Sequence, residues 1–471
     1  MIIKLVEVHC VRGAQIFFRK FKDLEFLIQN AEWNEIRYRK KGMPPGTMSW
    51  PIFGETAAFL KQGPDFMKNK RARYGNLFKT HILGSPTVIC MDPDVNRYIL
   101  LNEAKGLPPG YPVSMRNILG FHSISAVHGD IHKRIRGSVL SLVGPAATKD
   151  HLFPKTDKFT RLFLDNWAGK TIDIQERTKQ LAFFVVMNHI VEDEPFSFLE
   201  TFKATFDIMY LGTISLPIKI PGTNYSRGIK AREKVIAILK ELIAKRRASS
   251  ETFDDILDHL LRDEAYKLSD EEMLDQIITL LYSGYETTSV TTMMVVKYLH
   301  HHPKALQAIR DEHFAIKQRK ELEEPLNWDD YKNMTFTRAV IFETLRLASV
   351  INGPMRKTTR DVELNGLTIP KGWRVYVYIG ERNYDPFIYE EPFTFNPWRW
   401  LVEKDLESYN HMIFGGGGRL CPGKELGLAK ISLFLHYFVT KYRWEEVEGN
   451  KLRYFPRVEA PNGLYIRVAE Y

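Results

Sequence analysis

The ten residues Phe414-Gly-Gly-Gly-Gly-Arg-Leu-Cys-Pro-Gly423 decide the fold, because they place Cys421 just ahead of an amphipathic segment. Residues 424–442 repeat apolar side chains at helical spacing. The start of such a helix offers free N–H groups and a positive dipole end, which stabilise a thiolate. The glycines let the backbone turn tightly and approach a flat molecule. The stretch therefore predicts a loop that presents one sulfur to the metal of a flat cofactor.

Two other interpretations of this stretch are open. A cysteine is most often a small buried hydrophobic residue. Residues 418–424 also match the phosphate-binding pattern G-x-x-x-x-G-K. The next position of that pattern is a Ser or Thr that binds magnesium, but this chain has Glu425, and Pro422 removes a backbone N–H. A nucleotide loop is therefore disfavoured.

The spacing Phe-x-x-Gly-x-Arg-x-Cys-x-Gly is complete here, and by it the chain resembles the cytochrome P-450 family of haem-thiolate monooxygenases. The resemblance implies a mainly α fold with small β-sheets, of class α+β, and a long central helix over a haem held by a C-terminal Cys loop. It also implies that Cys421 is the axial ligand of the iron in haem b, where its electron donation favours O–O cleavage. The further haem-binding residues that it implies are His132, Arg136, Arg356, Phe414, Arg419 and Gly423.

Glu343 and Arg346 are three residues apart, which places them on one face of a predicted helix around residues 337–347. Alone, such a pair is usually a solvated surface pair. Residues 395–400, Phe-Asn-Pro-Trp-Arg-Trp, follow about fifty residues later. The resemblance implies that Arg399 joins Glu343 and Arg346 in a buried structural network that braces the haem-binding core.

Residues 270–301 are predicted to form one long helix, begun by a capping box of Ser269 and Glu272. Its middle, residues 283–289, contains glycine and several hydroxyl side chains that favour helix poorly. Hydroxyls that bond back to the preceding turn bend a helix and open a groove. The alternative is a small-residue face packed closely against a neighbouring helix. By resemblance, residues 283–287 are the oxygen-activation motif, with Glu286 and Thr287 as catalytic residues.

The histidines give little evidence of a separate metal site. His132 and Arg136 share a predicted helix face, although many relatives have Trp in place of His132. His128 and His132 have the spacing of a metal pair but lack a nearby third ligand. Residues 300–302, three consecutive histidines before a proline, are predicted to be a solvated helix end.

Composition agrees with one large domain over residues 37–471, preceded by an atypical segment over residues 1–36. β-like runs lie at residues 78–90, 363–370, 374–379 and 463–468. The chain has three cysteines, which argues against a disulfide framework. This cysteine content fits a reducing compartment. The net charge of +9 is spread among acidic residues, which disfavours nucleic-acid binding. By resemblance, a basic face with Lys424 and Lys430 would dock NADPH-cytochrome P-450 reductase.

The N-terminal segment lacks the membrane anchor that membrane-bound relatives carry. Residues 1–33 contain nine charged side chains spread along the segment, so no part of it is predicted to cross a bilayer. The basic, proline-rich hinge over residues 37–46 is present. The resemblance implies the cytosolic face of the endoplasmic reticulum membrane. The segment either lies on that membrane surface through its aromatic residues or is an altered or mispredicted first exon.

Residues 38–88, 212–225 and 434–444 look like the plant brassinosteroid C-6 oxidases. This resemblance implies a monomer that oxidises a 6-deoxo steroid first to a 6-hydroxy intermediate and then to a ketone, as in 6-deoxocastasterone to castasterone. Other sterols, triterpenoids, gibberellins and abscisic acid are alternative substrates in related plant branches. The predicted substrate contacts are Tyr282, Ser283, Val350, Asn352 and Leu464. Asn352 has an equally good interpretation as a turn residue bonding its own backbone.

The reaction implied by the resemblance uses O2 and electrons from NADPH. Thr287 would order a proton-delivering water, and Glu286 would help to relay the proton. A haem-thiolate isomerase or dehydratase needs neither O2 nor a reductase, but its members usually lack an intact acid-threonine pair such as residues 286 and 287. A catalytically silent haem-binding protein would show the same motifs.

Overall fold

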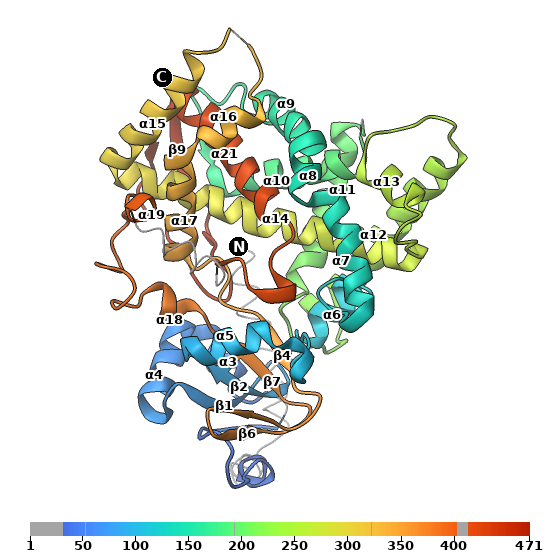
Figure 1. Ribbon diagram of the computed structural model, residues 1–471, viewed down its shortest axis with the longest axis vertical. Helices are drawn as coiled ribbons and strands as arrows, with labels where there is room; N and C mark the ends of the chain where they lie inside the picture. The colour runs from blue at the N-terminus through green and yellow to red at the C-terminus, as the bar shows by residue number, and fades with distance from the viewer. Residues whose placement is uncertain (1–31, 52, 193, 322, 403–412) are drawn as a thin grey trace. The chain divides into compact units, whose positions relative to one another are not determined.

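The computed structural model describes residues 32–51, 53–192, 194–321, 323–402 and 413–471. These residues are mainly helical with small sheets, which confirms the predicted class. The chain divides into two compact units, each built from discontinuous segments (Figure 1). Unit 1 consists of Met1–Ile118, Ile208–Ala231 and Gly353–Ile379, and unit 2 of Leu119–Asp207, Arg232–Asn352 and Gly380–Tyr471. The prediction of one functional domain over residues 37–471 stays a prediction.

Unit 1 is organised around a four-stranded sheet with the order β1-β2-β7-β4. β1 and β2 are antiparallel neighbours, β2 and β7 are parallel, and β7 and β4 are antiparallel. A separate hairpin pairs β5 with β6. The elements of this unit are α3 (Thr56–Gln62), α4 (Pro64–Tyr74), β1 (Leu77–Ile82), β2 (Ser85–Cys90), α5 (Pro93–Leu101), η1 (Glu103–Lys105), β4 (Met355–Lys357), β5 (Val362–Leu364), β6 (Leu367–Ile369) and β7 (Arg374–Val377).

Unit 2 is mostly helical and carries a three-stranded antiparallel sheet with the order β3-β9-β8. Its elements are α7 (Gly129–Val143), α8 (Pro145–Ala147), η2 (Thr148–Leu152), α9 (Phe153–Phe163), β3 (Thr171–Asp173), α10 (Ile174–Ile190), α13 (Ile256–Arg262), α14 (Asp270–His301), α15 (Pro303–Lys317), α16 (Trp328–Asn333), α17 (Thr335–Ala348), α18 (Gly380–Asn383), α19 (Arg399–Val402), η3 (Gly417–Arg419), α21 (Lys424–Lys441), β8 (Tyr442–Glu446) and β9 (Tyr465–Glu470). Three further helices have residues in both units: α6 (Val113–Leu119), α11 (Phe196–Leu211) and α12 (Asn224–Ala248).

The long helix α14 has the predicted bounds and the predicted start. The Ser269 side chain accepts from the Glu272 N–H, and the Glu272 carboxylate accepts from the Ser269 N–H. Acidic residues 270–272 also lie at the positive end of the helix dipole. The helix ends at His301, and Pro303 begins α15 at a position where a missing N–H costs nothing.

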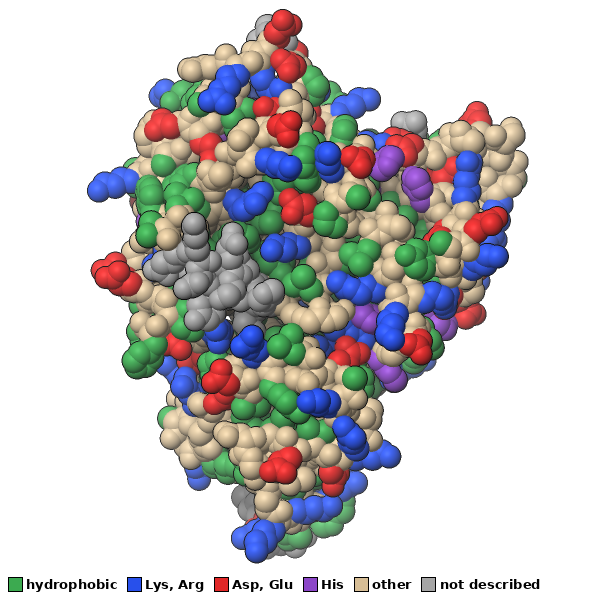
Figure 2. All heavy atoms as spheres, viewed as in Figure 1, with side chains coloured by type: hydrophobic (Ala, Val, Ile, Leu, Met, Phe, Trp, Pro, Cys, Tyr) green, Lys and Arg blue, Asp and Glu red, His purple; other side chains and the backbone are tan. Residues whose placement is uncertain are grey.

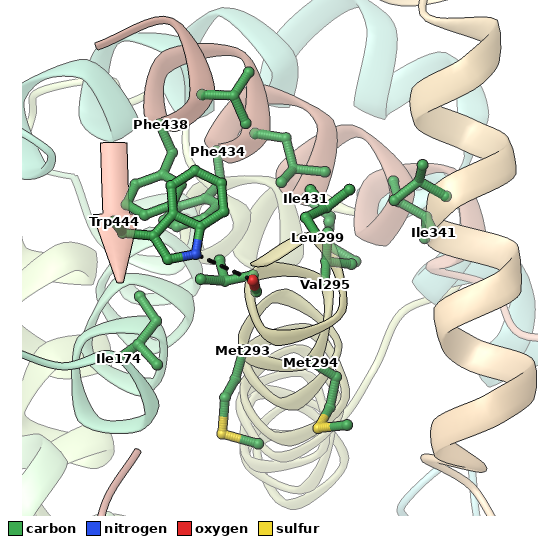
Figure 3. Close-up of a cluster of buried hydrophobic side chains, with 14 of the residues drawn as sticks. Ile174, Met293, Met294, Val295, Leu299, Ile341, Ile431, Phe434, Phe438 and Trp444 are labelled. Atoms are coloured by element: carbon green, nitrogen blue, oxygen red, sulfur yellow. Dashed lines mark hydrogen bonds between the residues drawn. The ribbon is translucent and has the colours of Figure 1, made fainter. Parts of the chain in front are cut away.

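The core of unit 2 surrounds α14, which packs against α10, α17 and α21 (Figure 1). Figure 3 shows Met293, Met294 and Leu299 of α14 among Ile341 of α17 and aromatic residues of α21 and β8. The indole Nε1 of Trp444 donates to the Val296 carbonyl oxygen at 3.2 Å, so this buried polar atom is satisfied. Each such buried apolar side chain contributes about 1.5–3 kcal/mol, so this core fixes α14 relative to α21.

Two of the predicted β-like runs each contain two strands that pair as a hairpin. The run at residues 78–90 contains β1 and β2, and the run at residues 363–370 contains β5 and β6. The first turn uses Leu83 and Gly84 at φ 51° and 73°, and leucine rarely takes this left-handed conformation. Gly84 is a turn residue but Leu83 is not, so the run was not divided at this point. β3, β4 and β8 were not predicted at all.

Within the described ranges, no helix combines the length and the apolar character that a membrane crossing requires. The predictions about residues 1–31 lie outside the described residues. On the face drawn in Figure 2, basic and acidic side chains are interspersed rather than gathered in one basic field.

Candidate functional site

Cys421 lies three residues before Lys424, the first residue of α21 in unit 2, as the sequence predicts. Its backbone N–H donates to the Phe414 carbonyl oxygen at 2.9 Å, which closes the glycine loop. Gly415 and Gly417 have φ of 80° and 60°, a region that other residues enter only at a cost. A side-chain carbon added at Gly418 or Gly423 would meet no other atom within 4 Å. The loop therefore leaves open space around Cys421, which is exposed.

Three neighbours act on the Cys421 thiol. The protein packed around the sulfur raises the pKa of the thiol, whereas the Gly423 N–H and the positive charges of Arg136 and Lys424 lower it. These three groups favour the thiolate, and metal coordination deprotonates a thiol outright. An exposed cysteine at a helix start with cationic neighbours is a donor set that fits a haem-thiolate centre.

The predicted cationic residues tie the glycine loop to its surroundings. Arg136 of α7 donates to the Leu420 carbonyl oxygen at 2.8 Å. Arg419 donates to the carbonyl oxygens of Ile124 and Val127 at 2.7 and 2.6 Å. His132 is buried one turn before Arg136 on α7. The structure thus brings these three residues and Phe414 to one region of unit 2, whereas Arg356 lies buried in β4 of unit 1.

Glu343, Arg346 and Arg399 meet in unit 2 as a fully buried cluster. The Arg346 guanidinium donates to both Glu343 carboxylate oxygens at 2.9 and 2.8 Å, and Arg399 donates to Glu343 at 3.2 Å. Trp400 Nε1 and the Asn396 N–H complete the carboxylate's partners, each at 2.9 Å. These two donors were not predicted. A buried carboxylate with this many donors is compensated for its lost hydration.

The oxygen-activation motif lies in the middle of α14, and the helix runs through it without a break. Thr287 Oγ1 donates to the Ser283 carbonyl oxygen at 2.8 Å, which is the predicted bond back to the preceding turn. A side-chain carbon at Gly284 would lie 2.8 Å from Val186 Cγ2 of α10. The close-packing interpretation is therefore also realised, because the glycine lets α10 and α14 approach.

Glu286 of the same motif has a partner that the sequence analysis missed. Its carboxylate forms an ion pair with Arg457, with 3.0 Å between Glu286 Oε1 and Arg457 Nε. The two residues are far apart along the chain, so no local pattern reveals the pair.

The predicted substrate contacts fall into two groups. Tyr282, Val350 and Asn352 are half-buried and Ser283 is exposed, so their side chains have free surface. Asn352 Nδ2 contacts the Pro456 carbonyl oxygen at 3.5 Å, a partner that neither interpretation of this residue anticipated. Leu464 is a correction. It is only 1% exposed and packs in the core of unit 2, so it is not available to a ligand.

Lys430 is a second correction. It was predicted on a basic docking face near Lys424, but its side chain is buried and lines a small cavity with Thr156, Thr178, Thr288 and Thr292. Burial lowers the pKa of Lys430 to about 7. The apolar residues around it in α21 place position 430 on the inner helix face, which the helical periodicity could have shown.

Asp275 and Gln276, in the second turn of α14, accept hydrogen bonds from the segment before α7. The sequence analysis overlooked both residues. The Asp275 carboxylate accepts from the His122 N–H at 2.9 Å, and Gln276 Oε1 accepts from the Ile124 N–H at 3.1 Å. Gly120 has φ of 105°, and any side chain there would collide with Asp275. A polar pair on the apolar stripe of a helix was the available signal.

Comparisons with known proteins agree with this geometry. The profile of the family described as Cytochrome P450 matches residues 44–460. Cytochrome P450 85A of Phaseolus vulgaris is 59% identical over 93% of this chain and 95% of its own length. The 3beta,22alpha-dihydroxysteroid 3-dehydrogenase of Arabidopsis thaliana is 38% identical over 89% of this chain and 91% of its own. The structure of a retinoic acid-bound cyanobacterial CYP120A1 superposes with a TM-score of 0.83 at 27% identity, covering 91% of this chain and 99% of that one.

Proposed function

The chain belongs to the cytochrome P450 family, and we propose that within it the protein is a brassinosteroid C-6 oxidase. It is a haem-thiolate monooxygenase that uses haem b, O2 and electrons from NADPH supplied through a reductase. The observation that supports the proposal best is the 59% identity to a Cytochrome P450 85A across almost the whole chain. The 38% identity to a steroid 3-dehydrogenase supports a steroid substrate in the same way.

The reaction inserts one oxygen atom of O2 into a C–H bond and reduces the other to water. NADPH supplies two electrons, and it and the solvent supply two protons, so that steroid, O2, NADPH and H⁺ give hydroxysteroid, water and NADP⁺. The haem, when bound, supplies the oxygen and redox chemistry. A second round at the same carbon converts the alcohol to a ketone.

The chain's own residues serve this reaction in three ways. Cys421 would hold the haem iron through its sulfur, and Phe414, Arg419 and Gly423 of the loop would line the haem together with His132 and Arg136 of α7. Arg356 of unit 1 is included in this set by family resemblance. Thr287 orders a water, and Glu286 passes a proton toward it. Proton delivery by a positioned group contributes about 100- to 10,000-fold to such rates.

Glu343, Arg346 and Arg399 hold residues 383–400 against α17. Arg346 ties α17 to the chain near α18, because its guanidinium also donates to the carbonyl oxygens of Asn383 and Pro392 at 2.6 Å. Tyr282, Ser283, Val350 and Asn352 remain the proposed steroid contacts. Apolar walls with a few polar groups suit a rigid steroid with few hydroxyls.

The remaining partners belong to the same proposal. The protein acts as a monomer on the cytosolic face of the endoplasmic reticulum membrane. The basic, proline-rich residues 37–46 support this location, because they resemble the hinge of membrane-bound relatives.

Purified protein reconstituted with a plant reductase and NADPH tests the function. 6-Deoxocastasterone should give first a 6-hydroxy product and then castasterone, and the reduced carbon-monoxide spectrum should be that of thiolate ligation. Cys421→Ser should lose that thiolate band. If 6-deoxocastasterone is untouched while a gibberellin precursor or a triterpenoid is hydroxylated, the C-6 oxidase assignment is wrong and the monooxygenase class stands.

A further inference from the structure

The ion pair between Glu286 and Arg457 joins the middle of α14 to the segment between β8 and β9, both in unit 2. Both side chains are mostly buried, with Arg457 13% and Glu286 15% exposed. An ion pair in such surroundings is screened less by water than a surface pair is. Arg457 therefore restricts the directions in which the Glu286 carboxylate can point.

The neighbouring Thr287 is also engaged. Its hydroxyl donates to the Ser283 carbonyl oxygen at 2.8 Å, while the Glu286 carboxylate faces Arg457. Each of the two proposed proton-relay groups thus has its own partner within unit 2.

The segment that carries Arg457 is held firmly. Arg453 and Glu459 exchange two backbone hydrogen bonds of 2.8 Å, and their side chains form an ion pair. Phe455 and Val458, which flank Arg457 along the chain, are buried with exposures of 6% and 2%. The Pro456 carbonyl oxygen contacts Asn352 Nδ2, which belongs to a proposed steroid-contacting segment. The position of Arg457 is therefore set by the fold of unit 2, and its neighbour Pro456 contacts Asn352.

We propose that Arg457 is a positioning residue that holds Glu286 until proton transfer and so determines how much NADPH oxidation leads to steroid oxidation. This inference rests on the proposed function, in which Glu286 relays protons. Without Arg457 the carboxylate has no fixed orientation, and proton delivery loses its coordination with O2 reduction. O2 that has received two electrons from NADPH and two protons then leaves as H2O2, and the steroid C–H bond stays intact.

Three single variants isolate the ion pair. Arg457→Met removes the charge and keeps the length of the side chain, Arg457→Lys keeps the charge, and Arg453→Met breaks the neighbouring ion pair without touching Glu286. Arg457→Met should lower product per NADPH by roughly threefold to tenfold and raise H2O2 to match, a fraction of the effect of losing positioned proton transfer altogether. Arg457→Lys should recover most of the coupling, and Arg453→Met should behave as wild type.

Substrate binding supplies a readout that does not depend on turnover. Steroid affinity from the binding difference spectrum should stay within about twofold of wild type in all three variants, because Arg457 acts through Glu286 and not through the haem pocket as a whole. A large loss of affinity in Arg457→Met would assign the residue to substrate binding and overturn the proposal.

A fourth variant shows whether Arg457 acts through Glu286. In a Glu286→Gln background, adding Arg457→Met should change coupling no further, since the group that Arg457 positions is already lost. Wild-type coupling in Arg457→Met, equal uncoupling in Arg453→Met, or an additive loss in the double variant would each contradict the proposal. The comparison uses any substrate that the wild-type protein oxidises, so a failed C-6 assignment leaves this test intact.

Discussion

Thr287 and Thr291 are one turn apart on α14 and make the same backbone contact in different surroundings. Each hydroxyl donates to the carbonyl oxygen four residues earlier, at 2.8 and 2.7 Å. Thr287 is half-buried within the proposed oxygen-activation motif, whereas Thr291 is 1% exposed and lies in the protein interior. The Thr287 hydroxyl can therefore contact a water molecule, whereas the Thr291 hydroxyl contacts only the helix backbone.

Thr287→Ala should lower product per NADPH by about tenfold or more and raise H2O2 correspondingly, because the proton-delivering water loses its partner. Steroid affinity should remain near that of wild type. Thr291→Ala is the matched control, since it removes an equivalent hydroxyl from the same helix. If the two variants uncouple equally, the effect comes from the helix and not from proton delivery. Product, NADPH consumed and H2O2 should be measured in one reaction.

Residue identities near the cysteine were predictable where the chemistry is local. The glycines, Arg419 and Cys421 lie within a few positions, so their spacing alone indicates a loop that presents a sulfur. The role proposed for Arg457 was not predictable, because it depends on the ion pair with Glu286. The two residues are far apart along the chain and meet only in the folded protein. Trp400 was likewise visible in the sequence, but only the folded chain shows that its Nε1 completes the partners of Glu343.

At the scale of elements, Gly284 sets the distance between α10 and α14. Gly284→Ala should destabilise the protein by about 1–3 kcal/mol, because the added carbon meets Val186 at 2.8 Å and the helices must separate. Gly427→Ala in α21 is the control, since an added carbon there meets nothing within 4 Å. That change should stabilise by up to about 0.5–1 kcal/mol, the usual gain from removing a helix glycine. Thermal unfolding midpoints that move in opposite directions bear out this account, and a stable Gly284→Ala contradicts it.

The helix α14, which has local signals at both ends, was predicted to the residue. α14 begins and ends as predicted, because its capping box and the following proline are both short-range features. The four-stranded sheet was not predicted, because β2 finds β7 only after most of the chain has intervened. The hairpin turn has Gly84 in its second position, but its first position is Leu83 instead of the Asn or Asp that usually marks such turns.

At the scale of the whole molecule, Lys430 links stability to pH. Its pKa is lowered to about 7 from 10.5 by burial. Between these values the unfolded chain binds a proton that the folded chain does not, so stability is lost as pH falls from about 10.5 toward 7. Below that range both states are protonated, and this lysine causes no further change.

Lys430→Met should therefore raise the free energy of unfolding at pH 7 by on the order of a few kcal/mol, and with it the thermal unfolding midpoint. This gain should shrink toward pH 10. The exposed Lys304→Met provides the control and should shift the midpoint little at either pH. A gain of the same size at pH 7 and pH 10 would mean that packing, and not titration, explains the effect. The measurement is a pair of melting curves for each variant at the two pH values.

β2 pairs in parallel with β7, with Thr87 opposite Arg374. The sheet of unit 1 therefore cannot form completely until the ribosome has synthesised β7. At 5–20 residues per second, a ribosome needs roughly 15 to 60 s to make the chain between these two residues. For that time β2 has an open edge, and strands 1 and 2 alone form only a hairpin, which is marginally stable in water. A nascent chain stalled before residue 374 should consequently bind chaperones through this edge, and one released past residue 379 should not.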